Sequence, residues 1–139
     1  MGVLIKTHYN GQLKTTLTHT PSGAVTTTDA PRDNGGDAST FSPTDMVAGA
    51  LGSCMLTLMG ITARKLDIDI SGSSAEVMKE MVATPRRRIA ALRTSLTIRS
   101  KQLTSEQKKA LEFAALTCPV KESIHPEIDA TTTFIYETL

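Results

Sequence analysis

Residues 41–65 read FSPTDMVAGALGSCMLTLMGITARK, and this stretch decides the fold. Its central 18 residues, 46–63, carry no charge, and Asp45 and Arg64 bound them on either side. Such a stretch just reaches the length of a membrane-spanning helix, but three glycines, a serine and two threonines dilute its apolar character. We therefore expect a buried helix in the protein core and no interaction with a membrane.

The residues that flank this stretch mark the ends of the helix. Ser42 is a typical N-cap residue, Pro43 suits the first helical position, and Asp45 is favoured near the positive end of the helix dipole. We place the other end near Leu66. A helix that is apolar nearly all round must be buried on most sides, and a chain of 139 residues has little material to surround it. The pattern therefore favours a homodimer.

The composition is that of one ordinary globular domain, which we expect to span residues 1–139. Hydrophobic residues make up 40% and charged residues 21% of the chain, near the average for globular proteins. The 15 Lys and Arg residues against 14 Asp and Glu residues leave a net charge of +1. Domains that bind nucleic acids usually carry a clear excess of positive charge, so we expect no nucleic-acid partner.

The two cysteines, Cys54 and Cys118, are too few for a fold held together by disulfides. Residues 1–8 turn polar after a few positions and show no signal peptide. We therefore expect a cytoplasmic protein whose thiols are normally reduced. The two thiols then need an explanation other than a permanent cross-link.

Strand and helix signals alternate along the remaining segments, in the order typical of an α+β fold. Asn10-Gly11 is a strong signal for a hairpin turn, and residues 104–107 form a capping box. We expect residues 31–40 to form a loop. The expected strands cover residues 3–9, 12–19, 24–29, 90–99 and 128–136, with a largely extended segment at 68–82, and the further helices cover residues 104–117 and 119–124.

Each cysteine has a structural and a reactive interpretation. Cys54 lies in the middle of a helix among apolar neighbours, where a cysteine usually packs as a small hydrophobic residue with a raised pKa. Cys118 precedes Pro119 and falls at the cap of a short helix, where free N–H groups stabilise a thiolate and lower its pKa. It also fits there as a residue that merely fills the cap. Local sequence alone therefore ranks Cys118 above Cys54 as a thiolate.

No other cluster in the sequence points to a site. The three histidines have no ligand spacing and two cysteines make no zinc pattern, so we expect neither a metal nor a cofactor. Arg86-Arg87-Arg88 is interpreted as a solvated turn in preference to a phosphate site. A phosphate-binding loop, a dinucleotide fingerprint and a nucleophile-elbow serine are all missing.

Two short motifs, residues 41–54 (FSPTDMVAGALGSC) and 117–120 (TCPV), carry a resemblance to a known family. The first resembles the central-helix motif of the OsmC/Ohr family, in which Ser-Pro or Asn-Pro and an acidic residue lead to a cysteine. The second is similar to the Cys-Pro-Val motif that follows a long helix in the same family. Residues 29–31 and the glycines at 35–36 also resemble one branch of it. The two cysteines lie 64 residues apart, and the resemblance covers nearly the whole chain.

The resemblance implies a thiol-dependent peroxidase that reduces organic hydroperoxides and is itself reduced by a dithiol. It also implies an OsmC-like fold, with antiparallel sheets wrapped around long central helices in an intertwined homodimer. Carried over to this chain, Cys54 attacks the peroxide and becomes a sulfenic acid, and Cys118 resolves that acid as a disulfide. This order reverses the ranking from local sequence.

The family pattern also includes an arginine before the central helix and a glutamate shortly after its proline. Arg32 is the only arginine ahead of Pro43, and the resemblance gives it the role of stabilising the Cys54 thiolate and the leaving oxygen. Thr44 stands where the family has its glutamate. Asp45 resembles the acidic residue of a less characterised branch and would hold Arg32 by a charge-assisted hydrogen bond.

Three apolar neighbours of Cys54, namely Leu51, Met55 and Leu58, would favour an organic over an inorganic peroxide. Two other classes of function stay open at this point. One is a non-peroxidase stress protein or small-ligand-binding dimer, in which both thiols are structural and a groove holds an acyl ligand. The other is a thiol-disulfide or thioester enzyme. Peroxide consumption with a dithiol reductant would separate these classes.

Overall fold

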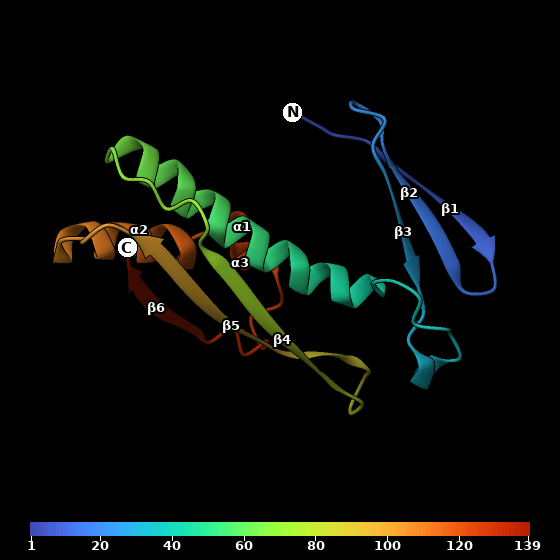
Figure 1. The fold of residues 1–139 in the computed structure, drawn as a ribbon. Helices are drawn as coiled ribbons and strands as arrows, with labels where there is room; N and C mark the ends of the chain where they lie inside the picture. The colour runs from blue at the N-terminus through green and yellow to red at the C-terminus, as the bar shows by residue number, and fades with distance from the viewer. The chain divides into compact units, whose positions relative to one another are not determined.

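The computed structural model describes residues 1–139, which group into two compact units, Met1–Val47 and Ala48–Leu139. The α+β class is confirmed (Figure 1). That all 139 residues form one domain stays a prediction. The elements in chain order are β1 (Ile5–Gly11), β2 (Lys14–His19), β3 (Val25–Asp29), the 3-10 turn η1 (Arg32–Asn34), α1 (Pro43–Lys65), β4 (Ser74–Val82), β5 (Arg88–Ser100), α2 (Ser105–Leu116), α3 (Pro119–Ser123) and β6 (Thr132–Thr138).

The three strands expected at residues 3–9, 12–19 and 24–29 are confirmed, and they form an antiparallel sheet in the order β1-β2-β3. The hairpin between β1 and β2 is confirmed, but its turn lies at Gln12 and Leu13, whose φ angles are 54° and 63°. Gly11, with φ 89°, sits instead at a bulge beside Asn10. A bulge and a tight turn both favour a glycine in the left-handed region, so Asn10-Gly11 carries the same signal for either. The turn predicted at these two residues therefore lies two positions further along the chain.

The sheet of the first unit buries no large apolar side chain. The residues of this unit that are buried are polar: Thr28, Asp29 and Ser42. Its large apolar side chains are exposed, and these include Val3, Leu4, Ile5, Tyr9, Leu13, Val25 and Phe41. A three-stranded sheet that buries no large apolar side chain gains little hydrophobic stabilisation of its own in water. Such a sheet needs an apolar surface to cover it.

Helix α1 begins at Pro43, as the sequence predicts, and Ser42 caps its N-terminus. The Asp45 backbone N–H donates to Ser42 Oγ at 3.1 Å, and the Ser42 backbone N–H donates to Asp45 Oδ2 at 2.9 Å. This reciprocal pair is a capping box with an aspartate in the acidic position. By length and composition α1 is apolar enough to cross a membrane, with a mean hydropathy of 1.7 over its most apolar window, 33% of which is buried.

The second unit holds a sheet in the order β4-β5-β6. Strands β4 and β5 are antiparallel, but β5 and β6 are parallel, with Thr94 opposite Thr132. The expectation of purely antiparallel sheets is therefore wrong for this pair. The chain leaves β5, passes through α2 and α3, and returns in the same direction, which is the long crossover that parallel pairing needs. The strand expected at residues 90–99 is confirmed, and it alternates from Leu92 onward, because Leu92, Leu96 and Ile98 are fully buried while Arg93 and Arg99 are exposed.

Two strand boundaries differ from the prediction. Residues 68–73 form a turn with Gly72 at φ 90°, so the extended segment begins only at Ser74. Strand β6 begins at Thr132, and an isolated β-bridge between Ala91 and Asp129 precedes it. In both segments an aspartate hydrogen-bonds locally instead of extending a strand. Asp69 accepts from the Ser71 N–H at 2.9 Å, and Asp129 accepts from the Thr131 N–H at 3.1 Å.

Helix α1 lies close to its own sheet at Gly52. A Cβ at Gly52 would lie 3.1 Å from Val77 Cγ2 and 3.3 Å from Ala75 Cβ, both on β4. Gly52 therefore packs against β4 of its own chain. The helix and β4 meet there because neither side carries a bulky group.

We therefore expect Gly52→Leu to lower the free energy of unfolding by about 1–3 kcal/mol, because overpacking forces the helix away from the strand. The matched control is Gly60→Leu on the same helix, since nothing lies within 4 Å of a Cβ at that position. Urea denaturation at one fixed protein concentration measures both. Equal midpoints for the two variants would show that the contact with β4 is not tight.

Candidate functional site

Cys118 lies at the junction of two helices in the second unit. Helix α2 starts at the predicted capping box, with Thr104 as N-cap and Gln107 as its reciprocal partner, and the chain then turns directly into α3. Cys118 is the N-cap residue of α3, as predicted, and its Sγ accepts from the Lys121 backbone N–H at 3.4 Å. The side chain is fully buried. Cys118 is therefore held in place both by packing and by the helix end.

Cys54 lies on α1, and the structure brings its side chain next to that of Cys118. Both cysteines are free thiols, and Cys54 is partly exposed while Cys118 is not. Burial raises the pKa of the Cys118 thiol above its ordinary value, and contact with the Cys54 side chain raises it further. The N–H groups of Lys121 and Val120 act in the opposite direction without offsetting the effect of burial.

The environment of the two thiols decides which one is better placed to meet a substrate. The N–H groups at the start of α3 do lower the pKa of Cys118, as expected, but burial outweighs them and the net shift is upward. A buried thiol with a raised pKa is a poor first nucleophile. Cys54 has the solvent access that Cys118 lacks. Of the two thiols, Cys54 is therefore the one that solvent and small molecules can reach.

Arg32 opens the 3-10 turn η1, inside the segment predicted to be a loop. Its side chain is exposed, and it belongs to the first unit, whereas both cysteines belong to the second. That Arg32 reaches Cys54 stays a prediction. Asp45 has a visible structural role, since its carboxylate accepts from the Ser42 N–H in the α1 capping box. That Asp45 also holds Arg32 stays a prediction as well.

The apolar residues expected around Cys54 divide into two groups. Leu51 and Met55 are fully buried and belong to the core of the second unit, so they do not line a space open to substrate. Leu58 is half-buried and is the one of the three that keeps some access. No three His, Cys, Asp or Glu side chains gather in a way that would hold a metal ion.

One carboxylate, that of Asp29, belongs to the resemblance at residues 29–31 but received no role from the sequence. Asp29 ends strand β3 with its side chain fully buried, and it accepts hydrogen bonds from the Ser39 backbone N–H at 2.9 Å and from Ser39 Oγ at 2.6 Å. These hydrogen bonds hold the pKa of Asp29 at about 2. The available signal was an acidic residue at a strand end, followed by a loop with two adjacent glycines.

Comparison of the sequence and the fold with known proteins identifies related proteins. The sequence model of the family described as OsmC-like protein matches residues 35–133. The crystal structure of a protein from Psychrobacter arcticus 273-4, named a putative osmotic stress induced and detoxification response protein, is 43% identical. The match covers 99% of this chain and 98% of that one, with a TM-score of 0.87. Among curated proteins, none matches this sequence.

More distant structures share the fold. An OsmC-like protein from Mycoplasma pneumoniae is 17% identical, with a TM-score of 0.81 over 98% of this chain and 97% of that one. A protein from Legionella pneumophila, named an organic hydroperoxide resistance protein OsmC, is 20% identical, with a TM-score of 0.72 over 97% of both chains. The family match over residues 35–133 includes both cysteines and the capping box of α1, and it shows that this chain belongs to the OsmC-like protein family.

Proposed function

We propose that this protein is a thiol-dependent peroxidase that reduces organic hydroperoxides, with Cys54 as the attacking thiol and Cys118 as the resolving thiol. The observation that carries the proposal is the pairing of a partly exposed Cys54 with a fully buried Cys118 whose pKa is raised by burial and by Cys54 itself. If both cysteines only packed in the core, neither thiol would need to be exposed to solvent. The names of several relatives, which refer to organic hydroperoxide resistance, agree with it.

The reaction proceeds in three steps whose atoms balance. The Cys54 thiolate attacks one peroxide oxygen, the O–O bond breaks, and the hydroperoxide leaves as an alcohol after taking up a proton. Cys54 is then a sulfenic acid. The Cys118 thiol attacks the Cys54 sulfur, water leaves, and a disulfide forms. A dithiol reductant finally exchanges with this disulfide, so both cysteines return to thiols and the reductant becomes a disulfide.

Arg32 and Asp45 complete the proposal on the substrate side. In the first step negative charge moves from the sulfur to the leaving oxygen, and a guanidinium placed there stabilises both. We assign that role to Arg32 and assign to Asp45 the role of holding it. The half-buried Leu58 favours an organic substituent over hydrogen on the peroxide. In a reducing cytoplasm the Cys54–Cys118 disulfide would form only transiently.

Peroxide-consumption kinetics with a dithiol reductant test this function. We expect turnover with an organic hydroperoxide and a lower kcat/KM with hydrogen peroxide at the same reductant concentration. Saturation of the rate with dithiol at fixed peroxide would agree with a disulfide intermediate. A protein that consumes neither peroxide while keeping both thiols free would favour the alternative of a non-peroxidase, ligand-binding dimer with structural thiols.

The proposal includes an intertwined homodimer in which the α1 helices of two copies pack together. Only 33% of the most apolar window of α1 is buried within the chain. The exposed face of the helix carries small or apolar uncharged residues, namely Gly49, Ala50, Ser53, Thr57 and Ile61. The apolar side chains of the first sheet are exposed as well. A second copy would cover both surfaces.

We expect sedimentation at micromolar concentration to give twice the chain mass of 14.9 kDa. Thr57→Arg should lower the mass toward the monomer or make the protein aggregate, because it buries an unpaired charge between helices. The control is Met78→Arg, since Met78 is 65% exposed on β4 and should tolerate a charge without change in mass. A stable, folded monomer of the unmodified protein at these concentrations would contradict the dimer.

A further inference from the structure

The loop between β3 and α1, residues 30–40, carries Arg32, and hydrogen bonds and ion pairs hold it in place. Its anchor is Asp29, a carboxylate with no exposed side-chain area. The carboxylate accepts two hydrogen bonds from Ser39, at the far end of the loop, through the backbone N–H and the hydroxyl. The Asp29 backbone N–H also donates to the Phe41 carbonyl at 3.1 Å. Both ends of the loop are therefore joined at one residue.

The loop is also closed on itself between these ends. The Pro31 carbonyl accepts from the N–H groups of Asn34 and Gly36, both at 3.0 Å, and the Ala30 carbonyl accepts from the Ala38 N–H at 3.2 Å. A Cβ at Gly36 would lie 1.9 Å from the Ala30 carbonyl oxygen, so no other residue fits there without moving the backbone. These contacts restrict the turn that carries Arg32 to one backbone conformation.

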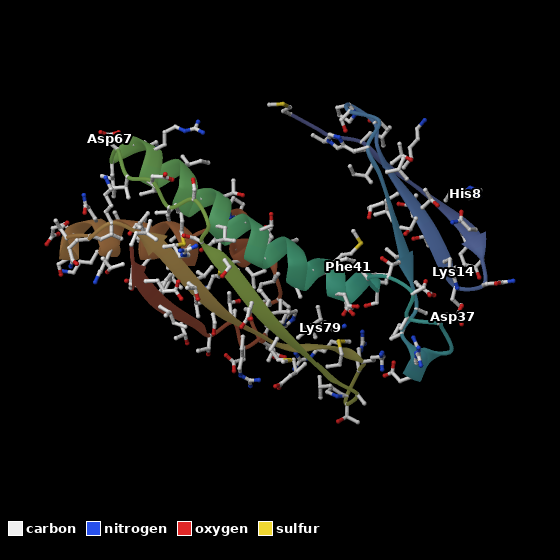
Figure 2. All side chains as sticks on the ribbon, viewed as in Figure 1. His8, Lys14, Asp37, Phe41, Asp67 and Lys79 are labelled. Atoms are coloured by element: carbon white, nitrogen blue, oxygen red, sulfur yellow. The ribbon has the colours of Figure 1, made fainter.

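A third tie comes from the β1–β2 hairpin. Lys14 Nζ lies 2.7 Å from Asp37 Oδ2 and 3.4 Å from Asp29 Oδ1, and it links the anchor to the middle of the loop (Figure 2 labels Lys14 and Asp37). The Leu13 carbonyl accepts from the Ala30 N–H at 3.2 Å. The ion pair of Lys14 with Asp37 is exposed to solvent, whereas the ion pair of Lys14 with Asp29 involves a buried carboxylate.

We propose that Asp29 is a positioning residue for Arg32: its buried carboxylate, with Ser39 as main partner and Lys14 as a second, holds the loop in one conformation before substrate arrives. A buried charge is costly for stability, and here two hydrogen bonds from Ser39 and the nearby Lys14 ammonium offset that cost. The carboxylate also fixes the position of the loop, because its oxygens accept hydrogen bonds only from donors at particular positions. This inference rests on the proposed role of Arg32, whose guanidinium must sit within hydrogen-bond distance of a developing charge.

A double-mutant cycle tests the inference. Asp29→Asn, and the milder Ser39→Ala, should lower kcat/KM for an organic hydroperoxide by about tenfold to a hundredfold, as expected when a reacting group is displaced by about 1 Å. In an Arg32→Gln background the same changes should cost less than about twofold, because Asp29 acts through Arg32. Hydrogen exchange of the amides at residues 36–39 should become faster in both single variants. Asp69→Asn, which removes a similar carboxylate from a turn of the second unit, is the matched control and should change neither readout at the loop.

The outcomes separate this inference from the proposed function. Equal losses in the two backgrounds, or full activity in Asp29→Asn and Ser39→Ala beside a large loss in Arg32→Gln, would overturn the positioning role alone. Full activity in Arg32→Gln would overturn the catalytic role of Arg32 and the inference with it. If Asp29→Asn does not fold, Ser39→Ala carries the test, since it keeps the buried carboxylate and its contact with Lys14.

Discussion

Replacing Cys54 by serine should lower kcat/KM for organic hydroperoxides by at least about a thousandfold, because a serine hydroxyl cannot replace the attacking thiolate. Cys118→Ser should behave differently. It keeps the first step, so it should consume about one equivalent of peroxide per chain and then stall as a sulfenic acid on Cys54. A dimedone-type probe should label Cys118→Ser after oxidation and leave Cys54→Ser unlabelled.

The control for disturbance at the α2–α3 junction is Thr117→Ser. A serine hydroxyl there can keep the hydrogen bond that Thr117 Oγ1 donates to the Phe113 carbonyl at 2.7 Å, next to Cys118. This variant should cycle at the unmodified rate. Labelling of the Cys54→Ser protein in place of the Cys118→Ser protein would mean that the buried thiol reacts first and that the roles of the two cysteines are exchanged.

Arg32→Gln is expected to lower the rate of Cys54 oxidation by an organic hydroperoxide about a hundredfold to a thousandfold, the usual effect of removing one group that stabilises a developing oxyanion. Arg32→Lys should recover part of the loss, because lysine keeps the charge without the planar fork of donors. Stopped-flow measurement of the second-order rate constant at limiting peroxide reads this step without the reductant.

Arg86→Gln provides the comparison, since Arg86 is exposed in the turn between β4 and β5 and belongs to the arginine run interpreted as solvated. Its rate constant should equal that of the unmodified protein. If Arg32→Gln oxidises at the unmodified rate, the guanidinium in the reaction is not that of Arg32, and a loss in Arg86→Gln would point to the arginine run.

The features that depend on neighbouring residues could be predicted from the sequence. The start of α1 at Ser42, the capping box of α2 and the N-cap position of Cys118 are set by hydrogen bonds within a few residues, and all three are confirmed. The alternation of β5 is equally local, because one face of the strand meets the core. The family resemblance added the two cysteines as a pair, and the structure brings them together.

The features that depend on distant parts of the chain could not be predicted. The sign of the Cys118 pKa shift follows from burial and from Cys54, which is 64 residues away in sequence. The parallel pairing of β6 follows from the crossover through α2 and α3. The buried carboxylate of Asp29 gains its partners from a loop residue ten positions later and from a different strand. Each of these depends on which segments pack together, which short-range patterns do not contain.

The central claim is that Cys54 and Cys118 form one redox pair, and mass spectrometry after oxidation tests it most directly. We predict that one equivalent of organic hydroperoxide removes two hydrogens from each chain and that peptide mapping finds a Cys54–Cys118 disulfide, which a dithiol reverses. Cα atoms of bridged cysteines lie within about 7 Å, so the thiol contact in the structure is compatible with this bond after little movement. Free thiols at both positions after the same treatment would contradict the account.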